Sequence, residues 1–131
     1  MDPGLAAALD SGDGEQVMAA LRAGARLLVP LVAVLDERDA QGADKSSHMA
    51  SVTLVQQDGR RGLLAFTSVQ SMRAWDPAAR PAPARAPDVA RSALDDGADG
   101  VLVDIAGPVR FALDGIALRQ VAEGAGLTPG P

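Results

Sequence analysis

The sequence predicts a single α/β domain of the α+β kind, with helices packed on a mixed or antiparallel sheet of about five strands. An apolar run rich in branched residues, LLVPLVAVL at 27–35, is typical of a strand buried on both faces. Asp58-Gly59 stands between two apolar stretches and is a strong hairpin signal. A chain of 131 residues can bury one core and not two. We therefore expect residues 1–124 to form one domain and residues 125–131 to be a flexible tail that can be removed with little loss of stability.

Helices are indicated where apolar side chains recur every three or four positions between a capping residue and a glycine. Asp13 can cap a helix over 14–23, with Gln16 at the third position of a capping box and Gly24 as the stop. The other expected helices are a short one around Leu5 and Leu9, one capped by Thr67 or Ser68 that ends at Asp76-Pro77, one from Pro87 to Gly97, and one capped by Asp114 that ends before Gly124.

Strands are predicted at five places along the chain. Within the first, Pro30 offers no N–H to a ladder, so the strand is expected to begin in earnest at Leu31. Two later stretches follow one plan of strand, tight turn, strand, cap and helix, which favours one sheet with helices on it. The expected strands after the first are residues 49–56, 62–66, 100–104 and 109–113.

Two segments are expected to lie outside the sheet. Residues 36–48 are polar and form the longest predicted loop. Residues 77–87, PAARPAPARAP, hold four prolines, which disfavour both helix and central strand. We expect this second segment to be an extended or polyproline-like connector on the surface.

Composition excludes several classes of function. Cysteine is absent, which removes disulfides, thiolate catalysis and cysteine-based zinc or iron–sulfur sites. The net charge of −5 argues against general binding of nucleic acid. No apolar run approaches the roughly 20 residues that a membrane-spanning helix needs, and the N-terminus has no signal-like pattern. We therefore expect a cytoplasmic protein without a nucleic-acid or membrane partner.

Residues that could carry catalysis or hold a metal form no specific motif. His48 is the only histidine, and a triad with Ser46, Ser47 or Ser68 would lack a Gly-x-Ser-x-Gly turn. Dinucleotide and triphosphate loops are also missing. We expect no catalytic residue, no cofactor and no metal, because the carboxylate pairs lack an EF-hand spacing and read as solvated or helix-end charges. These pairs are Asp36 with Asp39, Asp95 with Asp96, and Asp99 with Asp104.

Asp104 closes the apolar strand VLVD just before a tight turn. Its carboxylate is expected to accept hydrogen bonds from N–H groups of the turn, which is a structural role. A functional role for this carboxylate is the alternative.

The arginines are unevenly distributed. From 60 to 91 there are six arginines against two acids, a balance of +4, so the other six bases and fifteen acids carry −9. The only tryptophan and the proline-rich segment lie in the same stretch, and tryptophan and arginine are enriched where proteins bind one another. We predict a partner-binding surface here; the alternative is that the tryptophan fills the core while Arg80 pairs with Asp76 or caps a helix. The predicted residues are Trp75, Asp76, Arg80, Arg85 and Arg91.

The run DKSSHMASVTLVQQDGRRGLLAFTSVQSMRAWDPAARPAP resembles the SseB N-terminal-domain family in the form it takes in actinobacteria. The resemblance lies in the order of Asp-Lys, a Met-led strand, an Asp-Gly-Arg turn, Phe-Thr-Ser, Trp-Asp-Pro and Ala-Arg-Pro. DGADGVLVDIAGPVRFALD is similar to the second strand pair of the family. The resemblance covers about residues 27–123 and implies a fold without implying an enzymatic activity.

These observations predict a non-catalytic interaction or scaffolding module that binds an acidic protein segment or associates with itself. The alternative is a regulatory domain that binds a small anion or metabolite. Its candidate ligands to a carboxylate or phosphate are Arg60, Arg61, Arg80 and Arg110. A hydrolase or transferase is the third reading.

Overall fold

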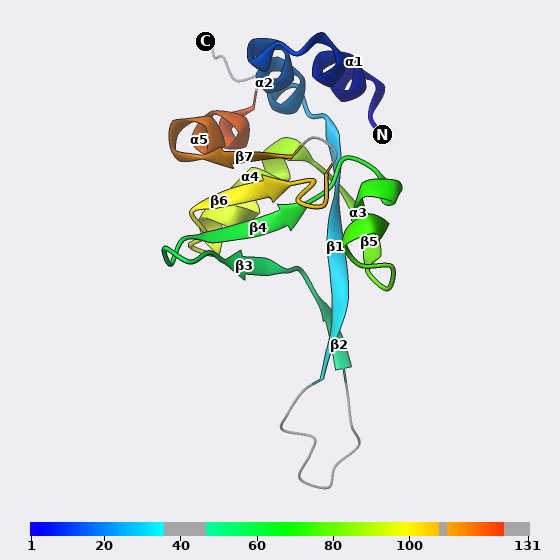
Figure 1. The fold of residues 1–131 in the computed structure, drawn as a ribbon. Helices are drawn as coiled ribbons and strands as arrows, with labels where there is room; N and C mark the ends of the chain where they lie inside the picture. The colour runs from blue at the N-terminus through cyan, green and yellow to red at the C-terminus, as the bar shows by residue number, and fades with distance from the viewer. Residues whose placement is uncertain (36–46, 108–109, 125–131) are drawn as a thin grey trace, which may run out of the picture.

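The structure, a computed structural model, describes residues 1–35, 47–107 and 110–124. In this part of the chain five helices and seven strands form one small α+β domain (Figure 1). The elements are α1 (Pro3–Ser11), α2 (Gly14–Arg22), β1 (Arg26–Leu35), β2 (Ser47–Ala50), β3 (Thr53–Val55), β4 (Arg61–Ala65), α3 (Val69–Trp75), β5 (Arg80–Arg85), α4 (Ala86–Asp95), β6 (Gly100–Val103), β7 (Phe111–Asp114) and α5 (Gly115–Glu123).

The central sheet has the strand order β3-β4-β6-β7. Its two outer pairs are antiparallel hairpins, β3 with β4 and β6 with β7, whereas β4 and β6 run parallel. The turn at Gly59, where φ is +87°, closes the first hairpin with a hydrogen bond from the N–H of Gln56 to the carbonyl of Arg60 at 2.8 Å. Both predicted hairpins are therefore confirmed.

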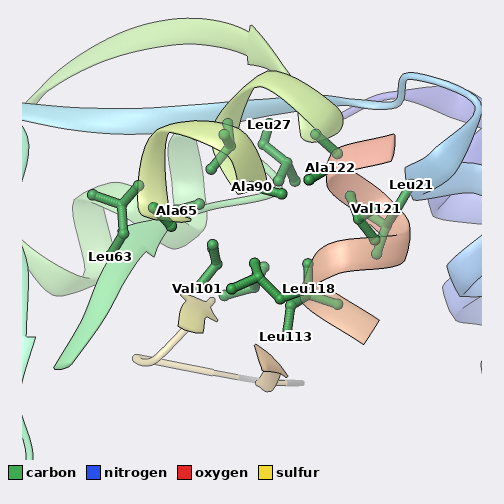
Figure 2. Close-up of a cluster of buried hydrophobic side chains, with 14 of the residues drawn as sticks. Leu21, Leu27, Leu63, Ala65, Ala90, Val101, Leu113, Leu118, Val121 and Ala122 are labelled. Carbon is green, nitrogen blue, oxygen red and sulfur yellow. The ribbon is translucent and has the colours of Figure 1, made fainter. Parts of the chain in front are cut away.

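The main core lies between this sheet and the helices α4 and α5. Figure 2 shows Leu63, Val101 and Leu113 of the sheet directed toward Ala90 of α4 and Val121 of α5. All five of these side chains are at most 4% exposed. The three strand side chains stand directly opposite one another in register, so they share the covered face of the pleated sheet.

A second, smaller core lies on the opposite face of the sheet. Leu64, Phe66 and Met72 are fully buried there, and Trp75 packs at its margin. Ser68 caps α3, the helix that covers this core, through a reciprocal capping box with Ser71. The predicted side-chain cap is thus confirmed at Ser68 and not at Thr67.

A second sheet, with the order β2-β1-β5, stands beside the central one. Its long strand β1 runs past the central sheet and projects with β2 beyond the rest of the molecule (Figure 1). Paired main-chain hydrogen bonds of 2.8 Å between Leu28 and Phe66 join the two sheets. The predicted sheet of about five strands is therefore divided in two, and the predicted strand 49–56 is broken at Ser51 and Val52 into β2 and β3.

Candidate functional site

The proline-rich segment forms a strand and not only a connector. β5 pairs with β1 in antiparallel register, and Pro81 stands opposite Pro30. Because neither proline has an N–H, this is a non-hydrogen-bonded pair, and the ladder bonds fall on its neighbours. By the same alternation, the ring nitrogen of Pro83 also faces away from β1. The expectation that 77–87 is an extended surface connector is met only in part, because residues 80–85 are extended but belong to a sheet. Ala86 and Pro87 are buried in the first turn of α4.

One face of this sheet gathers several features of the predicted surface. Directly opposed side chains lie on the same face, so Pro83 shares a face with Leu28, and Arg85 shares it with Arg26. Leu28 packs against the small core that holds Trp75, which shows that this is the α3 side of the sheet. We call Arg26, Pro81, Pro83 and Arg85 the β5 face; all four side chains are exposed.

Two arginines stand directly opposite each other on the β5 face. At a non-hydrogen-bonded pair the β-carbons of Arg26 and Arg85 are about 5 Å apart, and like charges so placed repel. A methyl group on Gly24 would come within 3.0 Å of Arg85 Nη1, so the guanidinium lies over the Gly24 backbone. Within the described residues neither arginine forms an ion pair with a carboxylate. This pair is therefore a place where an anion would relieve repulsion.

Asp2 is the acidic group beside this pair. It caps α1 by accepting a 3.1 Å hydrogen bond from the Leu5 N–H, and its other oxygen accepts one of 3.1 Å from the Arg26 N–H. The hydrogen bond from Arg26 is the main cause that lowers the pKa of Asp2 below its ordinary value of 3.8. The charge of Arg26 also lowers it, so Asp2 offsets part of the positive charge of the β5 face.

The lowered pKa of Asp2 has a consequence for stability. A depressed carboxyl pKa stabilises the fold above the unfolded pKa, and this contribution is lost as the pH falls through the folded pKa. Asp2→Asn should therefore lower the Tm at about pH 6, and the difference from the parent protein should shrink at about pH 2.5. Thermal unfolding of both proteins at the two pH values measures this. A difference that is the same at both values would contradict the role of the Asp2 charge.

Trp75 is shared between the small core and the surface. Its ring stacks on Phe66, with the ring centroids 5.7 Å apart and the planes at 29°. It is partly exposed, whereas Phe66 is completely buried. Trp75 can therefore stabilise the core with one side and meet a partner with the other.

The other predicted partner-binding residues are more dispersed. Arg80 and Arg85 are five positions apart on β5, so their side chains point to opposite faces of the sheet. Arg91 lies on α4, where it donates a 2.7 Å hydrogen bond to the carbonyl of Ala122 and pairs with Asp88. Asp76 accepts a 2.9 Å hydrogen bond from the Ala78 N–H after α3. The structure thus brings Trp75 and Arg85 to one side of the sheet and gives Arg91 and Asp76 internal partners.

Two arginines considered as small-anion ligands also have internal partners. Arg60 Nη2 lies 3.3 Å from Asp114 Oδ2. Arg61 Nη2 donates to the carbonyl of Gly97 at 2.9 Å, which satisfies the backbone after α4. Arg110 is exposed. Asp114 holds the predicted N-cap position of α5, but its carboxylate makes no capping hydrogen bond.

Asp104 is the centre of the one network of buried polar side chains in the described residues. Its carboxylate accepts from the Thr67 N–H at 2.8 Å, from the Thr67 hydroxyl at 2.6 Å and from the Ser71 hydroxyl at 2.9 Å. Asp104 is 5% exposed and has φ of +55°, in the left-handed region. The prediction that this carboxylate accepts N–H groups of its own turn is wrong, because the N–H that it accepts belongs to Thr67, 37 positions away.

The remaining expectations concern metal binding, membrane spanning and the candidate residues around His48. Across residues 1–35, 47–107 and 110–124, no three His, Asp or Glu side chains lie close enough together to hold a metal ion. In the same ranges no helix is long and apolar enough to cross a membrane. Residues 36–46, which include Asp36, Asp39 and Ser46, lie outside the described residues. The same holds for residues 125–131 and for the side chains of Ser47 and His48.

Arg26 is the residue of this site that sequence reasoning missed. It precedes the apolar run and lies outside the arginine-rich stretch 60–91. Only the register of β1 and β5 places it against Arg85. Arg26 could have been found only by predicting that residues 26–31 pair with residues 80–85. The prolines in 80–85 argued against a strand there, so this pairing was not predicted.

Comparison with known proteins identifies a family for the chain. Residues 4–120 match the family model described as SseB protein N-terminal domain. Searches of the curated proteins and of the solved structures returned no match. The family match covers most of the chain, so the chain belongs to the SseB N-terminal-domain family.

Proposed function

We propose that the chain is a non-catalytic interaction module that binds an acidic protein segment on the β5 face. The observation that carries this proposal is the directly opposed pair Arg26 and Arg85, exposed on a protein whose net charge is −5. Two guanidinium groups offer forked donors that match carboxylates in geometry and charge. The exposed rings of Pro81 and Pro83 and the partly exposed Trp75 add apolar contact area on the same side.

The partner binds through side chains and not by extending the sheet. With Pro81 and Pro83 facing outward, the free edge of β5 lacks the N–H groups that an added strand would need. A segment lying across the β5 face can still place its carboxylates between the arginines. Specificity then comes from the spacing of acidic and apolar side chains in the partner.

Binding of a fluorescent ten-residue peptide rich in Asp and Glu tests the proposal. Arg26→Ala with Arg85→Ala should weaken binding at least tenfold and change the Tm little, because exposed arginines contribute little to folding. Arg110→Ala with Arg119→Ala is the matched control, since it changes the net charge equally at exposed positions elsewhere. Raising the salt from about 50 to 150 mM should also weaken the complex. Equal losses in both double variants, or no binding by the parent, would overturn the proposal.

Two further measurements distinguish binding of an acidic protein segment from binding of a small anion and from self-association. Phosphate and citrate are added as competitors: if they bind as tightly as the peptide and shift the Tm, the β5 face is a small-anion site and the regulatory-domain reading replaces the protein-binding one. Light scattering over a range of protein concentrations tests self-association. A mass that rises with concentration in the parent and not in the Arg26 and Arg85 double variant would identify a second copy as the acidic partner.

A further inference from the structure

A cleft of about 640 Å³ opens beside Asp104, and none of the residues of the β5 face lines it. The segments after β4 and β6 form one wall, and α1 contributes to the rest. Since β4 and β6 are parallel, Thr67 and Asp104 follow the carboxyl ends of neighbouring strands. In open α/β sheets, crevices at the carboxyl ends of parallel strands commonly bind small molecules. Polar groups on the wall include Ser68, Gln70 and Ser71.

Within the part of the chain that the structure describes, the buried carboxylate of Asp104 forms no ion pair. None of the side chains that line the cleft belongs to a lysine, arginine or histidine, and Asp10 of α1 is also acidic. Met1 lines the cleft as well, but its α-amino group forms no ion pair with Asp104 in the structure. Burial of a charge is costly unless it is paired, and neutral hydrogen bonds offset only part of that cost. The three donors to Asp104 are an amide and two hydroxyls. A cation is therefore the group that the site lacks.

The hydrogen bonds around Asp104 also leave room for a further donor. A carboxylate has about four acceptor positions, and three donors among the described residues reach that of Asp104. The Ser71 hydroxyl has a single proton but lies within hydrogen-bond distance of both Asp104 Oδ1, at 2.9 Å, and the carbonyl of Ser68, at 3.0 Å. Whenever Ser71 donates to Ser68, Asp104 keeps only the two donors of Thr67.

The backbone holds the carboxylate in place for a ligand. The Asp104 N–H donates to the carbonyl of Ala65 at 3.1 Å, and its carbonyl accepts from Gly107 at 2.8 Å. These bonds maintain the left-handed conformation at φ +55°, which is uncommon outside glycine and is frequent at binding sites. The backbone N–H and carbonyl of Asp104 are thus both held by hydrogen bonds before a ligand binds.

We propose that this cleft binds a small molecule through a primary ammonium group that donates to Asp104. An ammonium carries three N–H donors and a positive charge, so it can fill the open acceptor position and bond to the neighbouring serine oxygens. The rest of the molecule would lie against Ala74 and Ala106 on the wall. This site is separate from the β5 face and does not depend on the function proposed for it.

Titration with ethanolamine, followed by NMR of the backbone amides, tests this inference. We expect a dissociation constant of about 1–10 mM, since so small a ligand has few atoms with which to bind. The amide signals of Thr67, Ser68 and Ser71 should shift. Ethylene glycol, which has the same size without the charge, should bind at least tenfold more weakly.

Two variants locate the site without touching its hydrogen bonds. Ala74→Leu places a larger side chain at an exposed position on the cleft wall and should weaken ethanolamine binding at least tenfold. Ala7→Leu makes the same exchange at an exposed position of α1 that does not line the cleft, and should leave affinity within twofold. The inference is overturned if ethylene glycol binds as tightly as ethanolamine, if Ala74→Leu binds like the parent, or if no amide shifts at about 100 mM ethanolamine, ten times the weakest affinity expected.

Discussion

Phe66→Ala should lower the free energy of unfolding by about 4 kcal/mol, because it removes a large, completely buried side chain and leaves a cavity. Phe66 lies where the two sheets meet, and its ring is the stacking partner of Trp75. Urea unfolding followed by fluorescence measures the loss. The signal comes from Trp75 alone, since the chain has no other tryptophan and no tyrosine.

The control for this substitution is Phe111→Ala. Phe111 is only partly buried at the edge of the main core, so we expect a loss of about 1–2 kcal/mol. In the native state of Phe66→Ala the emission of Trp75 should also shift to longer wavelength, as water replaces its ring partner. A loss below about 1 kcal/mol for Phe66→Ala, with unchanged emission, would contradict the described packing of the small core.

Asp104→Ala should lower the free energy of unfolding by about 3 kcal/mol. The substitution leaves the buried Thr67 N–H and hydroxyl without an acceptor, and each such group costs about 1–3 kcal/mol. Alanine also tolerates the left-handed backbone at φ +55° less well than aspartate does, by about 1 kcal/mol. Urea unfolding at neutral pH again provides the measurement.

Two further variants divide this effect into its parts. Asp104→Asn keeps one oxygen acceptor and the preference for the left-handed region, so its loss should lie between the parent and Asp104→Ala. Asp99→Ala removes an exposed carboxylate that accepts one 2.8 Å hydrogen bond from the Arg61 N–H, and should cost about 1 kcal/mol. If Asp99→Ala lowered the free energy of unfolding as much as Asp104→Ala, the large effect of Asp104→Ala could not be attributed to the burial of its hydrogen-bond network.

Local signals in the sequence predicted the elements well. The Asp58-Gly59 turn, the caps at Asp13 and Ser68 and the helix from Pro87 depend on neighbouring residues, and the structure has each of them. The strand that contains Pro30 begins at Arg26, earlier than expected. It can do so because Pro30 occupies a position where no ladder hydrogen bond is needed.

Long-range pairing is what the sequence did not reveal. Residues 80–85 were expected to be a connector because proline disfavours sheets, yet Pro81 and Pro83 turn their nitrogens to the free edge, where this restriction does not apply. The opposition of Arg26 and Arg85 and the reach of Asp104 to Thr67 both join residues far apart in the chain. No periodicity or capping rule predicts such contacts, and the two candidate sites depend on them.

The parallel pairing of β4 and β6 limits how the chain can fold. The sequence contains two stretches with one plan, yet the inner strand of the first finds its neighbour in the second, with Gly62 opposite Gly100, 38 positions later. The central sheet therefore cannot be completed within either stretch alone. The entropy cost of closing so long a loop arises before the strand contacts that offset it can form. Non-local pairings are therefore slow to form. The repeated plan consequently describes one cooperative unit, whose two halves acquire their stability together.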